Sequence, residues 1–141
     1  MSDPLQALLA RSGVLLFLLG LLTGFAIPAV RAPRIALSAH VAAIESGLAL
    51  VVFGLLGARL ALTGGWAAAI AHTLWISLYV LWVGLLLGAV FGTGKTLPIA
   101  GAGLRAKPWQ ETTAFALIGA GSFGSAAAVA ALLLEWSWRS V

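Results

Sequence analysis

The stretch LLFLLGLLTGFAIPAVRAPRIALSAH, residues 15–40, decides what kind of protein this is. It starts as an apolar run, passes through a loop punctuated by Pro28 and Pro33, and then enters a second apolar segment. A helix needs about 20 apolar residues to cross a bilayer. Inside a membrane every backbone N–H must be paired within the protein, so such runs fold as helices rather than as open strands. The stretch therefore predicts the end of one membrane helix and the start of the next.

Working outward from this stretch, four such apolar segments fit into the 141 residues. We expect helices at residues 5–30, 36–62, 66–90 and 111–138, with Ser38 as a candidate cap of the second helix and Glu111 opening the fourth. With 62% hydrophobic and 9% charged residues, the composition is that of a membrane protein. The sequence predicts one all-α domain, residues 1–141, folded as an integral membrane four-helix bundle. We expect it in the bacterial inner membrane, with the lipid bilayer as a partner.

Small residues and the distribution of charge refine this expectation. Gly20 and Gly24 have the four-residue spacing that lets two helices approach closely, and three glycines of the last helix (119, 121 and 124) suggest the same, which favours a homo-oligomer. The loops at residues 31–35 and 91–110 carry five of the eight Lys and Arg residues, which weakly favours a cytoplasmic position for both loops. The net charge of +4 is spread out, so nucleic acid is not expected as a partner. The chain has no cysteine, which excludes thiolate catalysis and thiolate metal sites.

The segment AVFGTGKT, residues 89–96, satisfies a relaxed phosphate-loop pattern. A phosphate loop joins a strand to a helix, whereas this segment follows a membrane helix and runs into Pro98. We interpret it as a glycine-rich turn that leaves the membrane and carries an interfacial lysine.

His40 is the residue with the sharpest chemical signal. Ionisable side chains within membrane helices are costly to bury and mark functional sites by default. In a chain without cysteine, a neutral histidine is a typical ligand of haem iron. The alternative is a structural histidine at the headgroup level that is hydrogen-bonded to a carbonyl of a neighbouring helix. A single histidine gives no spacing pattern that separates the two interpretations.

Other polar and aromatic side chains follow His40. Glu45 could carry protons or pair with a cation, or it could form a hydrogen bond at a subunit interface. His72 lies near the start of the third helix, where a polar side chain can reach the membrane interface, so its presence needs no functional role. Tyr79 lies deep in that helix together with Trp75 and Trp82, where the rings could line a flat apolar pocket or pack as core.

Two patches of the sequence resemble a known family. Residues 15–40, together with Trp82, GAVFGTG at 88–94 and PIAGAG from Pro98, resemble the small four-helix hydroxylaminobenzene mutases, which are themselves similar to the styrene oxide isomerases. The resemblance implies a homotrimer that holds haem b at its subunit interfaces through a histidine of the second helix, and His40 matches that ligand. It implies that ferric haem acts as a Lewis acid on a small aromatic substrate. An aromatic epoxide would become an aldehyde, or an N-arylhydroxylamine an aminophenol.

The same resemblance assigns roles to further residues. Ser46 occupies the position of a family asparagine six residues after the ligand, so we expect Ser46 to be catalytic. We also expect a catalytic role for Tyr79, not from the resemblance but because its ring could pack against an aromatic substrate. Leu81 and Leu85 replace a second asparagine and a pocket tyrosine. The main alternative function is a non-catalytic haem protein that acts as an electron carrier, sensor or anchor. A transporter subunit without cofactor, with Glu45 as its coupling carboxylate, is a third.

Overall fold

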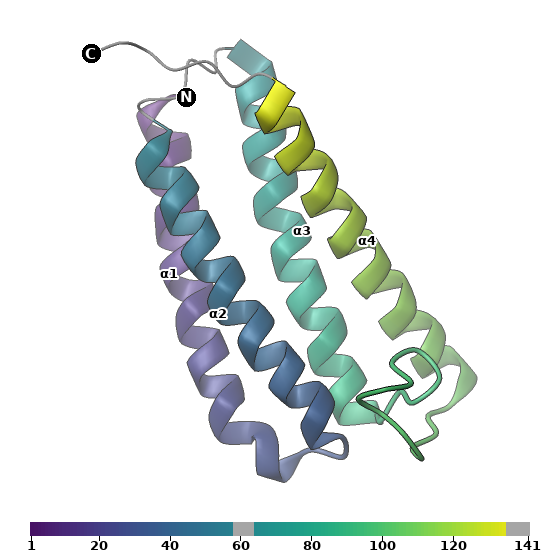
Figure 1. The fold of residues 1–141 in the computed structure, drawn as a ribbon. Helices are drawn as coiled ribbons and strands as arrows, with labels where there is room; N and C mark the ends of the chain where they lie inside the picture. Colours follow the sequence, from purple (N-terminus) through teal and green to yellow (C-terminus); the bar gives the residue numbers. More distant parts are fainter. Residues whose placement is uncertain (58–63, 135–141) are drawn as a thin grey trace.

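The computed structural model describes residues 1–57 and 64–134, and all regular secondary structure in this part of the chain is helical. Four long helices, α1 (Asp3–Ala26), α2 (Pro33–Leu56), α3 (Gly64–Phe91) and α4 (Pro108–Leu134), are joined by loops and a short 3-10 turn, η1 (Ile27–Ala29), as Figure 1 shows. Each of the four is long and apolar enough to cross a membrane. The all-α fold with four membrane-spanning helices is therefore confirmed.

Prolines set two of the helix starts earlier than expected. α2 begins at Pro33 rather than at residue 36, and α4 begins at Pro108 rather than at Glu111. Proline fits the first turn of a helix because the N–H that it lacks has no partner there. As a result, Ser38 is not a cap: it lies inside α2, and its hydroxyl donates to the carbonyl of Arg34 at 3.3 Å.

The other helix ends agree with expectation within a few residues. α1 ends at Ala26, where η1 takes over, so the helix does not continue to Val30. α3 extends slightly beyond its expected range at both ends. The ends expected at residues 62 and 138 lie outside the described residues.

The helices form two hairpins that lie side by side. α1 packs along α2, α3 packs along α4, and α2 with a small part of α1 joins the two hairpins by contacting α3 (Figure 1). Within the described residues α4 packs against α3 alone. The single chain is therefore an open array with α4 at one edge and α1 and α2 at the other, rather than a closed four-helix bundle.

Glycines set the distances within each hairpin. A Cβ atom on Gly13 would lie 2.6 Å from the carbonyl oxygen of Gly47, and one on Gly121 would lie 2.5 Å from the backbone nitrogen of Leu81. Both helix pairs thus approach backbone to backbone, as small residues allow in membranes. Gly119 does not take part in this packing within one chain, since an added Cβ would meet nothing within 4 Å.

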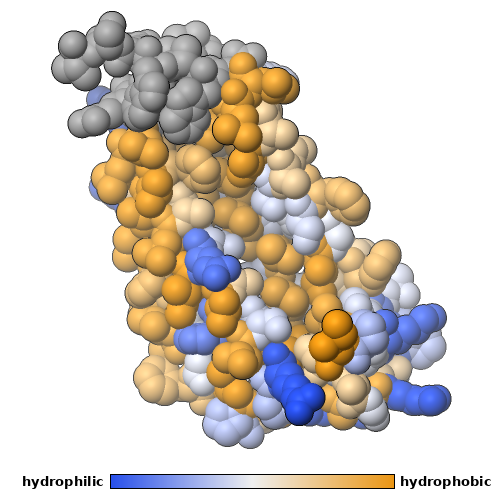
Figure 2. Space-filling view, in the orientation of Figure 1, coloured by the Kyte–Doolittle hydropathy of each residue, from blue (hydrophilic) through white to orange (hydrophobic). Residues whose placement is uncertain are grey.

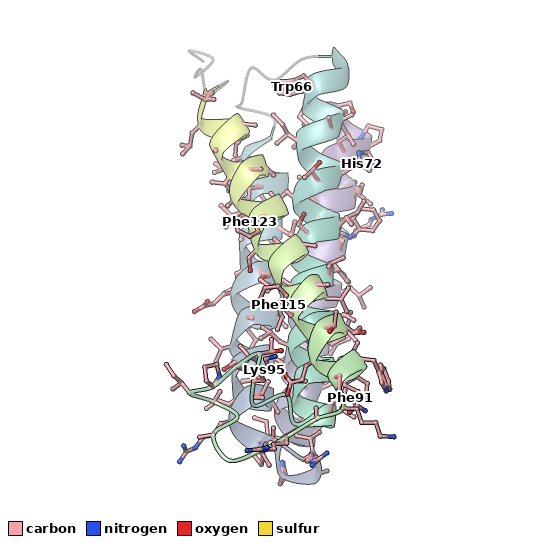
Figure 3. The ribbon with its side chains drawn as sticks, turned by 90° about the vertical axis from the view of Figure 1, so that its right-hand side faces the viewer. Trp66, His72, Phe91, Lys95, Phe115 and Phe123 are labelled. Carbon is pink, nitrogen blue, oxygen red and sulfur yellow. The ribbon has the colours of Figure 1, made fainter. Side chains whose placement is uncertain are left out.

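The molecular surface is apolar along the helices and polar at one end. Figure 2 shows the hydrophobic belt, and Figure 3 shows Phe115 and Phe123 along α4, with Lys95 near the loop end. Phe123 is 81% exposed in the single chain. A surface of this kind fits lipid or a second copy of the chain.

Candidate functional site

The imidazole of His40 links α2 to α1. Its Nδ1 atom lies 2.7 Å from the carbonyl oxygen of Gly20. Because a carbonyl oxygen can only accept a hydrogen bond, Nδ1 carries the ring proton and Nε2 keeps its lone pair. The side chain is half-buried, and Nε2 has no hydrogen-bond partner among residues 1–57 and 64–134. His40 thus makes the structural hydrogen bond expected of it and still has a free ligand atom.

Gly24 makes room for this ring. A Cβ atom on Gly24 would lie 2.9 Å from both Cε1 and Nδ1 of His40. Gly20 in turn lies against Ala43 and Ile44 of α2, where an added Cβ would come within 3.0 Å. The spacing of Gly20 and Gly24 therefore serves the histidine as well as helix packing.

The outer side of this site is open in a single chain. Leu37, one turn before His40 on the same face of α2, is 51% exposed, and Val41 is also exposed. On α1, Phe25 follows Gly24 and is 83% exposed. The half-buried ring therefore lies beside an apolar surface, which is suited to a flat hydrophobic ligand or to a second copy of the chain.

The donor set fits haem better than a bare metal ion. No group of three or more His, Cys, Asp or Glu side chains that could hold a metal occurs in the described part of the chain. A porphyrin supplies the equatorial ligands of its own iron, so one axial histidine is sufficient. Histidine ligands are commonly oriented by an N–H···O=C hydrogen bond from the other ring nitrogen, as Gly20 provides here.

Ser46 is separate from His40 within one chain. It is buried, at 8% exposure, and falls on the same stripe of α2 as Ala39 and Leu50. Six residues of helix place it about 9 Å further along the axis and on another face than His40. One chain alone does not bring the two side chains together.

Tyr79 fastens α3 to α1. Its hydroxyl donates to the carbonyl oxygen of Ser12 at 2.7 Å. Its ring packs edge-on against Trp75, with centroids 6.3 Å apart, and Trp75 stands in the same relation to His72. Tyr79 therefore belongs to an aromatic row along α3, and its phenolic proton is already engaged.

Trp82 makes a second link between α3 and α1. Its Nε1 donates to Thr23 Oγ1 at 3.3 Å, next to Gly24 in sequence. By contrast, the indole nitrogen of Trp75 is buried without a hydrogen-bond partner among the described residues.

The two apolar replacements in α3 are packing residues. Leu81 lies against Gly121 of α4, where an added Cβ would come within 2.7 Å of the leucine Cβ, and Leu85 is buried. Apolar packing therefore accounts for both side chains.

Glu45 and His72 point away from the packed interior. Glu45 is exposed in the middle of α2 and has no hydrogen bond or ion pair within the described residues. His72 is exposed as well, and its Nδ1 lies 2.8 Å from the carbonyl of Ala68 in its own helix. Like Nδ1 of His40, Nδ1 of His72 lies close to a backbone carbonyl, but this carbonyl belongs to its own helix rather than to a neighbouring one. His72 is therefore a suitable control for substitutions at His40.

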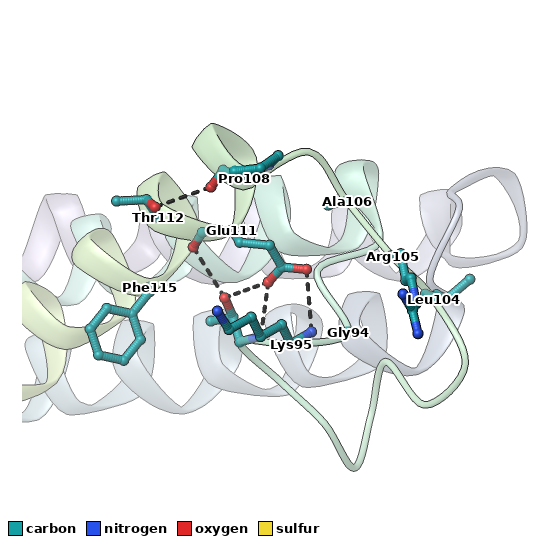
Figure 4. A pocket seen from close by; sticks show the side chains of 10 residues that line it. Gly94, Lys95, Leu104, Arg105, Ala106, Pro108, Glu111, Thr112 and Phe115 are labelled. Atoms are coloured by element: carbon teal, nitrogen blue, oxygen red, sulfur yellow. Dashed lines mark hydrogen bonds between the residues drawn. The ribbon is translucent and has the colours of Figure 1, made fainter.

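A site that sequence reasoning missed lies at the start of α4. The carboxylate of Glu111 accepts hydrogen bonds from the backbone N–H groups of Lys95 and Thr96, at 3.2 and 2.8 Å, and from the Thr96 hydroxyl at 2.7 Å (Figure 4). Two backbone amides of the glycine-rich turn at 89–96 thus donate to an anion of the same chain, the carboxylate of Glu111. The sequence shows Glu111 as the acid at the far end of the glycine-rich loop, but the pairing itself depends on how the loop folds back.

Comparisons with known proteins identify the family and relatives of the chain. A family model described as styrene oxide isomerase matches residues 5–137. The chain is 38% identical over 140 residues to hydroxylaminobenzene mutase HabB of Ectopseudomonas oleovorans, which covers 97% of this chain and 83% of the relative. It is 37% identical over 108 residues to hydroxylaminobenzene mutase HabA of the same organism, covering 76% of this chain and 80% of the relative. No solved structure gives a significant match.

Proposed function

The chain belongs to the styrene oxide isomerase family, and on that basis we propose that it is a haem-b-dependent membrane isomerase that rearranges N-arylhydroxylamines to aminophenols. Support for this substrate comes from the two hydroxylaminobenzene mutases, which align with most of the chain. A second candidate reaction, the conversion of a small aromatic epoxide to an aldehyde, is favoured by the name of the family.

The observation that carries the proposal is the state of His40. Its Nδ1–H is held by Gly20, its Nε2 is free, and the ring rests on Gly24. In the proposal His40 would hold haem b through its iron. When bound, ferric haem would supply a Lewis-acidic iron with an open coordination position for the substrate oxygen.

The overall reaction needs no external oxidant or reductant. An N–O bond breaks, a C–O bond forms on the ring, a proton leaves the ring carbon, and a proton is taken up by nitrogen. The protein's task is therefore to orient the substrate, to exclude water and to stabilise charge. We assign the hydrogen bond to the substrate to Ser46, because Ser46 occupies the position of the family asparagine. The ring of Tyr79 is assigned to packing against the substrate ring.

The proposed assembly is a homotrimer. The open array leaves the α1–α2 edge, where His40 lies, and the outer face of α4 without partners in one chain. A neighbouring subunit would cover the haem and complete the aromatic pocket. We further propose a location in the bacterial inner membrane, in keeping with four spanning helices.

A non-catalytic haem protein is the competing function. An electron carrier usually has two strong axial ligands. The chain holds two histidines and one methionine, Met1, and His72 lies on another helix, within its own hydrogen bond. Counting the strong ligands of the iron therefore separates the two functions.

The experiment is a turnover assay with two matched histidine variants. Purified protein is incubated with hydroxylaminobenzene and, separately, with styrene oxide, and products of unchanged mass are identified by chromatography. We expect aminophenol from the wild type and from His72→Ala, and none from His40→Ala. If haem-loaded wild type converts neither substrate and its spectrum indicates two strong ligands, the isomerase proposal fails and the haem-carrier function replaces it.

A further inference from the structure

A cavity lies at the loop end of the molecule. It has a volume of about 820 Å³, is open on one side, and lies between the loop that follows α3 and the first two turns of α4 (Figure 4). Lys95 and Arg105 line it from the loop, and Thr112 and Phe115 line it from the helix. Neither the proposed haem site nor the proposed reaction uses this cavity.

The cavity is held open by contacts on both sides of the loop. On one side, Glu111 binds the amides of Lys95 and Thr96. On the other, the Arg31 guanidinium donates to the carbonyl oxygens of Phe91 and Arg105, at 3.1 and 3.0 Å. The loop is therefore fixed to α4 and to the start of α2, and the cavity is preformed.

The charges that line the cavity favour an anion. The Lys95 and Arg105 side chains are exposed and make no hydrogen bond or ion pair within the described residues. The one acid in the lining, Glu111, already accepts three hydrogen bonds from the loop. Two cationic side chains without a partner among the described residues thus line a space whose wall includes the apolar side chains of Leu104 and Phe115.

The position along the membrane normal favours a lipid over a soluble ion. α4 spans 27 residues, about 40 Å of helix, whereas the hydrocarbon layer is about 30 Å thick. The first turn of α4 therefore lies among lipid headgroups. Phe115, two turns further in and 68% exposed, reaches the hydrocarbon. Trp109, 58% exposed and packed on Phe91 at 5.4 Å, marks the same interface.

We propose that this cavity binds the phosphate headgroup of an acidic phospholipid, held by Lys95 and Arg105, with an acyl chain along Phe115. Basic pockets at the ends of membrane helices commonly bind anionic headgroups. Free phosphate offers the same charge but gains nothing from the apolar wall.

The test measures lipid binding by the intact protein in detergent. Phosphatidylglycerol, phosphatidylcholine and soluble glycerol 3-phosphate are each added, and retained lipid is measured by native mass spectrometry alongside the thermal unfolding midpoint. We expect phosphatidylglycerol to be retained and to raise the unfolding midpoint of the wild type. In the double variant Lys95→Gln, Arg105→Gln its advantage over phosphatidylcholine should fall roughly tenfold or more.

Two control variants make the result decisive. Lys107→Gln removes a cation of the same loop that does not line the cavity, and it should keep the preference. Lys95→Arg, Arg105→Lys retains both charges and should keep it too, which separates charge from folding. Equal binding of the two lipids by wild type, or an equal loss in Lys107→Gln, would overturn the proposal. Stabilisation by glycerol 3-phosphate as strong as that by phosphatidylglycerol would also overturn it.

Discussion

The carbonyl oxygen of Gly20 accepts a hydrogen bond from Nδ1 of His40 across 2.7 Å, and it joins residues that lie twenty positions apart in the chain. This hydrogen bond fixes the tautomer of the ring, since a carbonyl cannot donate. It also satisfies a polar group that would be costly to leave unpaired in a membrane. One contact therefore gives His40 a structural role through Nδ1 and leaves Nε2 available as a ligand.

Gly24→Ala should weaken haem binding without unfolding the helices. The new Cβ would lie 2.9 Å from the His40 ring, so the imidazole must shift. Overpacking of this size costs about 1–3 kcal/mol, and we expect haem affinity to fall roughly tenfold. Gly65→Ala, at the start of α3, is the matched control, because nothing lies within 4 Å of its new Cβ. Haem titration of the two apo variants measures the difference, and equal affinities would remove Gly24 from the site.

Ser46→Ala should lower turnover more than haem content. Ser46 is assigned a hydrogen bond to the substrate, and the loss of one positioned donor typically costs about 100- to 1000-fold in rate. Steady-state kinetics on protein normalised by haem content test this. A variant that lost haem and activity in parallel would indicate that Ser46 supports the fold rather than the reaction.

Substitutions at Tyr79 should separate its ring from its hydroxyl. Tyr79→Phe loses the hydrogen bond to Ser12 but keeps the ring, so we expect a stability loss of about 0.5–1.5 kcal/mol and turnover within a few-fold of wild type. Tyr79→Leu should lose both stability and most turnover, because the ring is absent. Thermal unfolding and kinetics on both variants are needed. Tyr79→Phe with native stability but no turnover would assign the chemistry to the hydroxyl instead.

Glu111→Gln should loosen the loop between α3 and α4. A carboxamide places an N–H₂ group where one of the loop donors now points, and an unsatisfied buried donor costs about 1–3 kcal/mol. We expect faster proteolytic cleavage within residues 92–107 and a lower unfolding midpoint. Asp3→Asn removes an exposed acid of α1 and should change neither. Identical cleavage rates in Glu111→Gln and wild type would contradict the role given to Glu111.

The apolar pattern predicts the membrane helices because, in hydrocarbon, the backbone must pair its own N–H and C=O groups, as a helix does. Two helix boundaries differ from the expected ones, because α2 and α4 begin at Pro33 and Pro108, a few residues earlier than the pattern indicates. Periodicity alone could not foresee that α4 packs on α3 only, because apolar side chains look the same whether they meet lipid, another helix or another subunit.

At the candidate site, the sequence indicates His40 and a hydrogen bond from it to a carbonyl of a neighbouring helix, but it does not indicate which residues receive the ring. The spacing of Gly20 and Gly24 indicates helix packing, whereas their contact with the imidazole depends on the register between α1 and α2. The sequence pattern indicates only that Glu111 lies at the start of a helix. Its hydrogen bonds to Lys95 and Thr96 depend on how a sixteen-residue loop folds back, which no local pattern specifies.

The most direct test of the account is the absorption spectrum of purified wild type, His72→Gly and His40→Gly, each measured before and after the addition of imidazole, with circular dichroism to confirm the helices. The account predicts a haem Soret band in wild type and in His72→Gly, its loss in His40→Gly, and its return when free imidazole fills the space above Gly24. A His40→Gly protein that retains its full haem content without imidazole would contradict the assignment of His40 as the ligand.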